Sequence, residues 1–279
     1  MPIVVNGGPT GMQQGSKPWR DLRSCFITGS QYLPYTRPTH MTMHKKAIAE
    51  KASHWTASAP EVPIALQRMF DWGHFHEDLA RKQYTLQTII DNPQADVKVN
   101  DNVAMMIDDE GMIAASPDGI VTVTNQPPGV IEIKCPTGQY FWKRNARDPK
   151  YDINGIDSTQ MQHLYEDMGK TDIGRKYYEM DTQFRIGGKL ENHYLQCLGN
   201  LHLSGAAWCD YIVYVPFKKW HKGKHMRVKR ITREETEEDW ERTREALVHA
   251  YKESHGVFTE NLTRYLAEYE HTDFATADA

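Results

Sequence analysis

A stretch of twenty-one residues decides the fold of this chain. It begins Ser116-Pro117-Asp118-Gly119 and ends Val130-Ile131-Glu132-Ile133-Lys134-Cys135-Pro136. Residues 119–123 and 130–134 are rich in Val and Ile, which β-strands favour. The turn between them contains two prolines and a glycine, which cannot continue a strand. The stretch therefore predicts a β-hairpin that folds Asp118 back beside Glu132.

This hairpin gathers two carboxylates and one amine. Side chains two positions apart on a strand share a face, so Glu132 and Lys134 point together while Ile131 and Ile133 point into the core. Two carboxylates as close as Asp118 and Glu132 repel each other unless a positive charge lies between them. Oxygen ligands without Cys or His select Mg²⁺ or Mn²⁺ rather than zinc.

The chemistry that such a group can perform is phosphodiester hydrolysis. Two bound ions would stabilise the attacking and leaving oxygens of an in-line displacement, and Lys134 would orient or deprotonate the attacking water. The alternative for an Asp…Glu-x-Lys pattern is an ion pair on an exposed strand. The apolar residues Val130, Ile131 and Ile133 indicate a buried strand and favour the functional interpretation.

Three further blocks lie around this stretch in a fixed order. They are Arg23–Ser30, which reads R-x-x-x-[IV]-T-x-S; Trp72-Gly73 with Glu77, which reads WG-x-x-x-E; and Tyr194-Leu195-Gln196, which reads Y-x-Q. With residues 116–136 they resemble the lambda-exonuclease group, or YqaJ-type viral recombinases, of the PD-(D/E)XK nuclease superfamily. The resemblance covers about residues 19–215 and implies an α/β fold. That fold has a PD-(D/E)XK restriction-endonuclease-like core, in which helices flank a mixed central sheet.

The resemblance also implies roles for individual residues. The implied metal ligands are Asp118, Glu132, the backbone carbonyl of Ile133 and, through water, Glu77. The implied catalytic residues are these carboxylates with Lys134 and Gln196. The implied ligands of a 5′-terminal phosphate are Arg23, Ser30 and Ser116. Lys143 or Arg144 is the candidate for contact with the DNA backbone.

Four of the residues whose roles the resemblance implies have a purely structural alternative. Arg23 could be a solvated helix residue, and Gln196 could bridge helices. Glu77 could pair with Arg81 one helical turn away, a spacing that favours such an ion pair. Ser116 could shape the turn before the following proline.

The resemblance implies a magnesium-dependent 5′→3′ exonuclease that acts on double-stranded DNA ends and leaves 3′ single strands for recombination. Mn²⁺ is the expected substitute ion, with two ions in each active site. The implied partners are DNA ends, a single-strand annealing protein and two further copies of the chain in a ring-shaped trimer. The alternatives are a structure-specific or nicking endonuclease of the same superfamily, and an inactive adaptor that binds DNA ends.

The composition fits a globular protein. Of 279 residues, 39% are hydrophobic and 25% are charged, and no apolar run approaches the roughly 18 residues that a membrane span needs. The N-terminus has no secretory signal pattern, so we expect an intracellular protein with no membrane partner, in the host cytoplasm if it is viral. Its four cysteines lie far apart, which predicts reduced thiols rather than a disulfide framework or a zinc finger.

The formal net charge of −4 hides basic clusters. Residues 217–233 contain eight Lys or Arg side chains and no acid, and residues 143–150 form a second cluster. DNA responds to local potential, so both clusters are candidate contacts, although solvated loops are the alternative.

We expect one nuclease domain over residues 16–270, with an insertion at about 145–190. Residues 1–15 are expected to form a mobile arm and residues 271–279 a frayed tail. Periodicity predicts helices near 40–58, 72–84, 191–203, 234–252 and 257–269, and strands near 103–107, 112–116 and 211–215.

Overall fold

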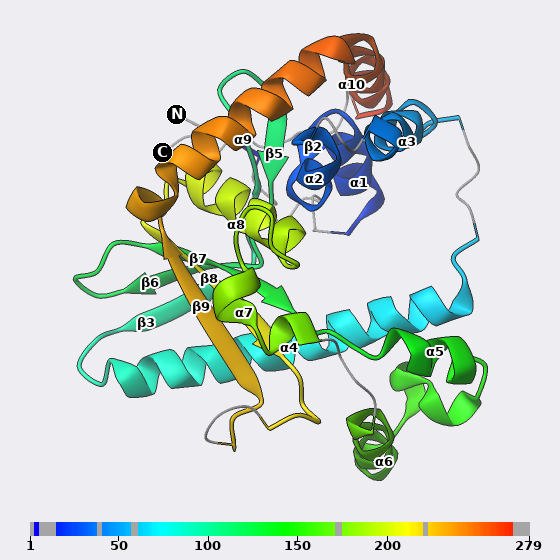
Figure 1. Cartoon of the computed structure of the whole chain (residues 1–279), viewed down its shortest axis with the longest axis vertical. Helices are drawn as coiled ribbons and strands as arrows, with labels where there is room; N and C mark the ends of the chain where they lie inside the picture. Colours follow the sequence, from blue (N-terminus) through cyan, green and yellow to red (C-terminus); the bar gives the residue numbers. More distant parts are fainter. Residues whose placement is uncertain are drawn as a thin grey trace.

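The computed structural model describes residues 3–5, 15–37, 41–56, 61–170, 175–219 and 223–269. At its centre is a five-stranded sheet with the strand order β3-β6-β7-β8-β9 (Figure 1). The strands are β3 (Val97–Asn100), β6 (Gly119–Val123), β7 (Gly129–Lys134), β8 (Trp208–Tyr214) and β9 (Met226–Thr232). β7 and β8 run parallel, and the other neighbouring pairs run antiparallel. The predicted mixed central sheet is therefore confirmed.

A smaller sheet has the order β1-β4-β5-β2. Its strands are β1 (Ile3–Val5), β4 (Met105–Ile107), β5 (Ile113–Ala115) and β2 (Ile27–Thr28). β2 runs parallel to β5. This pairing brings the segment that starts at Arg23 next to the strand that leads into Asp118.

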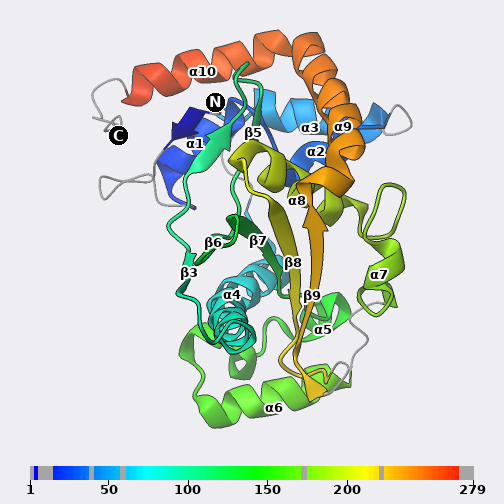
Figure 2. The same cartoon turned by 90° about the vertical axis from the view of Figure 1, so that its left-hand side faces the viewer.

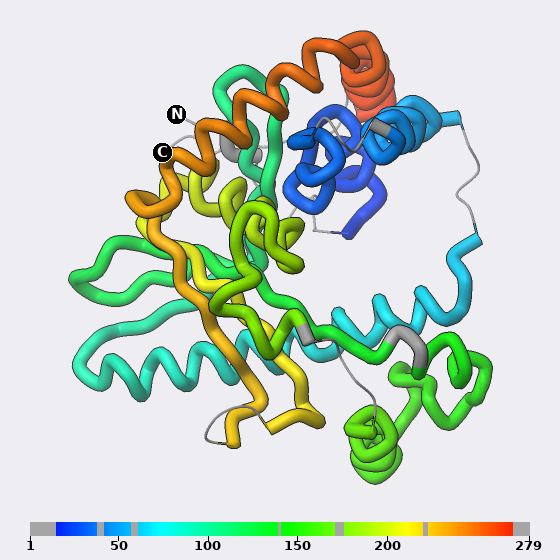
Figure 3. Tube along the Cα trace, viewed as in Figure 1, coloured from blue at the N-terminus to red at the C-terminus, as the bar shows by residue number. Residues whose placement is uncertain are grey.

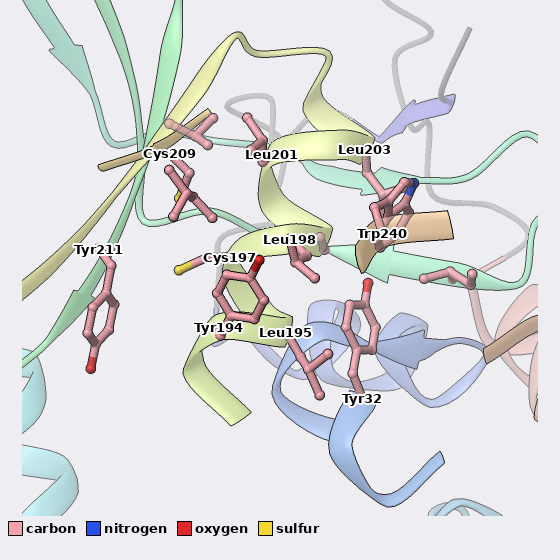
Figure 4. Packing of buried hydrophobic residues seen from close by; sticks show 14 of the residues in the cluster. Tyr32, Tyr194, Leu195, Cys197, Leu198, Leu201, Leu203, Cys209, Tyr211 and Trp240 are labelled. Atoms are coloured by element: carbon pink, nitrogen blue, oxygen red, sulfur yellow. The ribbon is translucent and has the colours of Figure 1, made fainter. Parts of the chain in front are cut away.

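Helices cover both faces of the central sheet. On one face, Ala80 and Tyr84 of α4 (Ile64–Asp91) pack in one cluster with Val121 and Ile131. On the other face lies α8 (Glu191–Ser204), whose buried leucines share a cluster with Tyr211 of β8 and with Tyr32 and Trp240 (Figure 4). Because both faces of β7 are covered, polar side chains on this strand lie inside the protein.

The remaining helices gather at two ends of the molecule (Figures 1 and 2). One end is formed by α1 (Lys17–Ser24), α2 (Tyr32–Tyr35), α3 (Met41–Ala52), α9 (Arg233–Glu253) and α10 (His255–Tyr269). The other end contains α5 (Gln139–Asn145) and α6 (Ser158–Gly169). The short α7 (Met180–Gln183) lies in front of β9 in Figure 1. The 3-10 turns are η1 (Gly29–Gln31), η3 (Pro149–Tyr151), η4 (Ile153–Gly155) and η5 (Arg175–Tyr177).

Segments from opposite ends of the sequence meet at the end of the molecule that α1, α2, α3, α9 and α10 form. The blue helices α1 and α3 lie against the red helix α10 (Figure 3). Asn261 of α10 is buried and donates hydrogen bonds to the carbonyl oxygens of Ser24 (3.1 Å) and Lys51 (3.0 Å). The C-terminal helix therefore holds the first two long helices together.

The predicted hairpin is formed by β6 and β7. Asn125 in its turn has a φ of 63°, a left-handed conformation that Asn tolerates. Gly129 opens β7 where a Cβ atom would lie 2.2 Å from the Trp208 ring, so only glycine fits. The close approach of β7 to β8 at this point depends on that glycine.

Several elements were not predicted, among them β3, β9 and α6. β3 and β9 form the edges of the central sheet, and α6 lies within the segment 145–190. The sequence signal for α6 was present, because Asp157 and Gln160 form a reciprocal capping box at its start. The strand β9 was not recognised because it lies within the basic cluster 217–233, whose many charged residues are not typical of a strand.

The arginines of that cluster are engaged within the protein. Arg227 donates to the carbonyl oxygens of Tyr177 and Tyr178, and Arg230 pairs with the buried Asp210 at 2.8 Å. Arg233 donates to the carbonyl oxygens of Leu201 and Ala206. These three side chains hold the fold together, which weakens the interpretation of the whole run as a DNA contact.

The domain limits remain predictions. Of the expected arm 1–15, the structure describes Gly15 and β1, while the other arm residues and the tail 271–279 lie outside the described residues. The described parts of 145–190 contain α6, α7 and three 3-10 turns. Tyr151 and Leu164 in this segment pack in one cluster with Trp72 of α4.

Candidate active site

Asp118 lies between β5 and β6, and the hairpin fixes its position. Its backbone N–H donates to the carbonyl of Ile131 at 3.0 Å. Its carboxylate accepts a 2.7 Å hydrogen bond from the backbone N–H of Ile133. The predicted neighbourhood of Asp118, Ile133 and the end of β7 is therefore present.

Glu132 is fully buried, on the face of β7 that α8 covers. Its Oε1 pairs with the ammonium of Lys134, as expected for two side chains on one face of a strand. Its Oε2 accepts a 2.7 Å hydrogen bond from the side-chain amide of Asn200. Both carboxylate oxygens are thus held by the protein.

Asn200 is a further candidate site residue, which the sequence did not predict. It is fully buried on α8, and it lies one helical turn beyond Gln196. Residues four apart share one face of a helix, so the role predicted for Gln196 could also have indicated that Asn200 faces the site. No hydrogen-bond partner for Asn200 Oδ1 lies among the described residues, although the atom is buried.

Burial and mutual charge shift the pKa values of Glu132, Asp118 and Lys134. Burial, together with the charge of Asp118, raises the pKa of Glu132 to about 8, against the opposing effect of Lys134. Burial also raises the pKa of Asp118. Burial lowers the pKa of Lys134, but the carboxylates of Glu132 and Asp118 outweigh it and leave that pKa above its usual value. Lys134 is therefore an ammonium ion at neutral pH, a hydrogen-bond donor rather than a proton acceptor.

Glu77 lies on α4, where its ion pair with Arg81 is present and its role toward a metal ion remains a prediction. It forms an ion pair with Arg81 at 2.9 Å, the structural alternative raised by its spacing. Burial and the nearby charge of Asp118 raise its pKa to about 7. Arg81 also donates to the backbone carbonyl of Asp118 at 3.3 Å, so this arginine, which was not predicted as a site residue, links α4 to the hairpin.

The donor set fits a hard divalent cation. Among the residues that the structure describes, no three His, Cys, Asp or Glu side chains gather into a metal site. An ion would instead be held by two carboxylates, from Asp118 and Glu132, with the backbone carbonyl of Ile133. These donors are all oxygens, which suits Mg²⁺. Burial and then repulsion from Asp118 raise the pKa of Glu132, and a bound cation would relieve that repulsion.

Arg23 and Ser30 form a second group beside the first. The Arg23 guanidinium donates to Thr28 Oγ1 and to Ser30 Oγ, each at 3.1 Å, and its face lies 4.3 Å from the Trp19 ring. Burial lowers the pKa of Arg23 to about 10, while Glu132 is near enough to oppose this shift. Arg23 is therefore a held cation rather than a solvated helix residue.

This second group opens into a polar pocket of about 220 Å³. Its lining includes Arg20, Arg23, Thr28, Ser30, Lys51 and His54. A pocket with cations and hydroxyl groups in its wall has the chemistry to receive a phosphate.

Ser116 and Gln196 lie near the two groups. Ser116 Oγ is buried, and no hydrogen-bond partner for it lies in the described part of the chain. Gln196 packs on the segment that carries Ser30, since a Cβ atom at Gly29 would lie 3.3 Å from its Cγ. Both positions suit the predicted roles, which remain predictions.

Lys143 and Arg144 lie apart from this group, on α5. Both are exposed, and they line a broad depression of about 810 Å³ with Arg147 and the start of α4. The structure therefore places these two candidates on a surface and not among the carboxylates.

Comparison with known proteins identifies the family. The sequence profile of the YqaJ-like viral recombinase domain matches residues 18–174, more than half of the chain. This chain belongs to the YqaJ-like viral recombinase family. The predicted resemblance is thereby confirmed, and no curated protein matches the chain.

Solved structures similar to this YqaJ-like chain include two exonucleases. An alkaline exonuclease (LHK-Exo) from Laribacter hongkongensis is 19% identical, with a TM-score of 0.48, and the match covers 91% of this chain and 99% of that one. A phage related exonuclease from Haemophilus somnus 129PT is 13% identical, with a TM-score of 0.43 and coverage of 84% and 96%.

Membership of the YqaJ-like family supports a DNA exonuclease of the recombinase type. In the part of the chain that the structure describes, no helix is both long enough and apolar enough to span a membrane.

Proposed function

We propose that this YqaJ-like chain is a Mg²⁺-dependent deoxyribonuclease that digests double-stranded DNA from its ends in the 5′→3′ direction. The observation that carries the proposal is the meeting of Asp118, Glu132 and Lys134 at the end of one hairpin. A DNA-end-binding adaptor without activity would not need all three.

The residues have separate tasks in this reaction. Asp118, Glu132 and the Ile133 carbonyl would hold Mg²⁺, which when bound polarises a phosphoryl oxygen and lowers the pKa of a bound water. The Lys134 ammonium donates hydrogen bonds, so it orients the attacking water and stabilises negative charge on the phosphate. Asn200 fixes the Glu132 carboxylate through Oε2. The water oxygen would form a bond to phosphorus as the bond to the leaving 3′ oxygen breaks, while the water gives up a proton to solvent and the leaving oxygen takes one up from solvent.

The pocket around Arg23 supports the choice of a 5′ end. Arg23 is held by two hydroxyl-bearing side chains, and Glu132 lies near enough to oppose the effect of burial on the pKa of Arg23. A phosphate bound there, with help from Ser30 and Ser116, would place the first phosphodiester near the carboxylates. The 3′ single strand left behind would pass to an annealing protein, and a ring-shaped trimer remains the proposed assembly.

Digestion of end-labelled linear duplexes tests the proposal. Substrates carry a 5′-phosphate or a 5′-hydroxyl and are incubated with Mg²⁺, with Mn²⁺ or with a chelator. We expect release of 5′ mononucleotides from phosphorylated ends with either ion and none with the chelator. Label released first from the 3′ end would contradict the polarity. Cleavage of closed circular DNA would favour the endonuclease, and binding without any cleavage would favour the adaptor.

A further inference from the structure

Lys51 is a buried lysine that the proposed mechanism does not use. It lies at the end of α3, and only 6% of its surface is exposed. Its ammonium donates to the carbonyl oxygens of Arg23 (2.6 Å) and Phe26 (2.8 Å), just where α1 ends. Carbonyls at a helix C-terminus carry partial negative charge and lack helical partners, so a cation stabilises them.

The same two carbonyls belong to the segment that shapes the phosphate pocket. Arg23 presents its backbone to Lys51 and its guanidinium to Thr28 and Ser30. Lys51 also lines the pocket itself. The lysine can therefore act on a bound ligand through the position of Arg23 and through its own charge.

The charges around Lys51 point to an anion. Burial, and then the charge of Arg23, lower its pKa to about 7, so the two cations repel each other across the pocket wall. Glu50 is the acid at the rim of the pocket, and its side chain is 59% exposed. A buried charge is costly unless it is paired, and Lys51 has two carbonyl acceptors but no carboxylate ion-pair partner among the described residues. A phosphate dianion in the pocket would offset the repulsion between Arg23 and Lys51.

We propose that Lys51 is a positioning and specificity-determining residue for the 5′-terminal phosphate. It fixes the end of α1 so that Arg23 faces Thr28 and Ser30, and it adds a second positive charge behind the pocket. This inference rests on the proposed function, because it takes the Arg23 pocket as the site of the phosphate.

The test compares kcat/KM for 5′-phosphorylated and 5′-hydroxyl duplexes. Lys51→Met keeps an unbranched side chain only one atom shorter but removes the charge and both hydrogen bonds. We expect the phosphate preference to fall about tenfold, mainly through a higher KM for the phosphorylated end. Should this variant fail to fold, Lys51→Gln removes the charge but keeps donors for the carbonyls, and the same loss is expected.

Two controls separate this role from a structural one. Lys46→Met removes the same charge from an exposed position of α3 and should leave the preference unchanged. Asn261→Ala removes the contacts of α10 with Ser24 and Lys51, and should lower the melting temperature with little change in preference. An equal loss of preference in Asn261→Ala and Lys51→Met would overturn the proposal, as would an unchanged preference in Lys51→Gln. A wild-type protein that digests both ends equally would instead contradict the proposed end recognition.

Discussion

Two side chains at the end of β7 carry the proposed chemistry. Glu132→Gln removes a charge that a cation would need, and Lys134→Ala removes the donor that would orient the water. We expect either change to lower kcat by at least about a hundredfold, while binding of duplex DNA in a chelator persists. The measurement is mononucleotide release beside a binding titration.

Lys98→Ala is the matched control for Lys134→Ala. Lys98 is an exposed lysine of β3 in the same sheet, and its loss should leave kcat unchanged. Normal turnover in Glu132→Gln or Lys134→Ala would contradict the site.

Asn200 allows a prediction about stability as well as activity. Asn200→Leu leaves Glu132 Oε2 buried without its donor, which should cost about 1–3 kcal/mol in the free energy of unfolding. It should also lower kcat, since the carboxylate is no longer fixed. Urea unfolding and initial rates measure the two effects. Asn192→Leu, at a half-buried position of the same helix, is the control, and equal results for both variants would remove Asn200 from the site.

At the scale of elements, α8 connects the site to α9. Asn200 on one side of the helix donates to the Glu132 carboxylate, and Gln196, one turn earlier, packs against Gly29. Near its end, His202 is buried and stacks on Trp240 of α9 at 5.3 Å. Its Nε2 lies 3.0 Å from Thr236 Oγ1. Burial, with a contribution from Arg233, lowers the pKa of His202 to about 4.

This shift predicts acid sensitivity. The pKa of His202 in the folded state lies below the unfolded value of about 6.5, so the unfolded chain binds the proton first as the pH falls. Stability is therefore lost as the pH falls from about 6.5 towards 4, by up to about 1.4 kcal/mol per pH unit for this residue. Urea midpoints at pH 7 and pH 5 measure the loss.

A pair of variants isolates the effect of His202. His202→Asn should make the difference between the two pH values smaller than in the wild type. His249→Asn, at an exposed position of α9, should leave it unchanged. An identical pH dependence in wild type and His202→Asn would show that the buried imidazole does not cause it.

Elements differ in how far their sequence predicted them. Helices α8, α9 and α10 follow their apolar periodicity, and α1 begins after Ser16, whose side chain accepts the N–H of Trp19. The sequence of β9 does not predict a strand, because it is rich in charged residues. Its arginines are accommodated in the sheet by partners that are distant in the sequence. Arg230, for example, pairs with Asp210 on the neighbouring strand.

At the scale of the whole molecule, folding brings the buried carboxylate of Glu132 and the half-buried carboxylate of Asp118 together before any ligand arrives. Mg²⁺ that binds Asp118 and Glu132 in the folded state alone should therefore stabilise the protein. At a hundred times the dissociation constant, one site adds about 2.7 kcal/mol. We expect a higher melting temperature in Mg²⁺ than in a chelator, and no such shift in Glu132→Gln. Equal melting temperatures for the wild type in both conditions would contradict the metal site.

Local pattern along the chain was sufficient for the hairpin and for the grouping of Asp118, Ile133, Glu132 and Lys134. A turn of fixed chemistry and a two-residue period set those positions over nineteen residues or fewer, so no distant contact is needed. Local pattern could not decide whether Glu77 belongs to the site or pairs with Arg81, nor whether Arg23 binds a phosphate or is a solvated helix residue. Glu77 pairs with Arg81 and also senses Asp118, and both facts depend on where α4 lies against the hairpin.

The partners of the site residues came from the folded chain alone. Asn200 reaches Glu132 across 68 positions, and Lys51 reaches the end of α1 across 28. Such contacts depend on how α8 and α3 pack, and packing is set by apolar side chains that are themselves far apart in sequence. The periodicity of one segment does not indicate which distant segment will pack against it. The environment of each charged side chain is therefore determined by the tertiary structure.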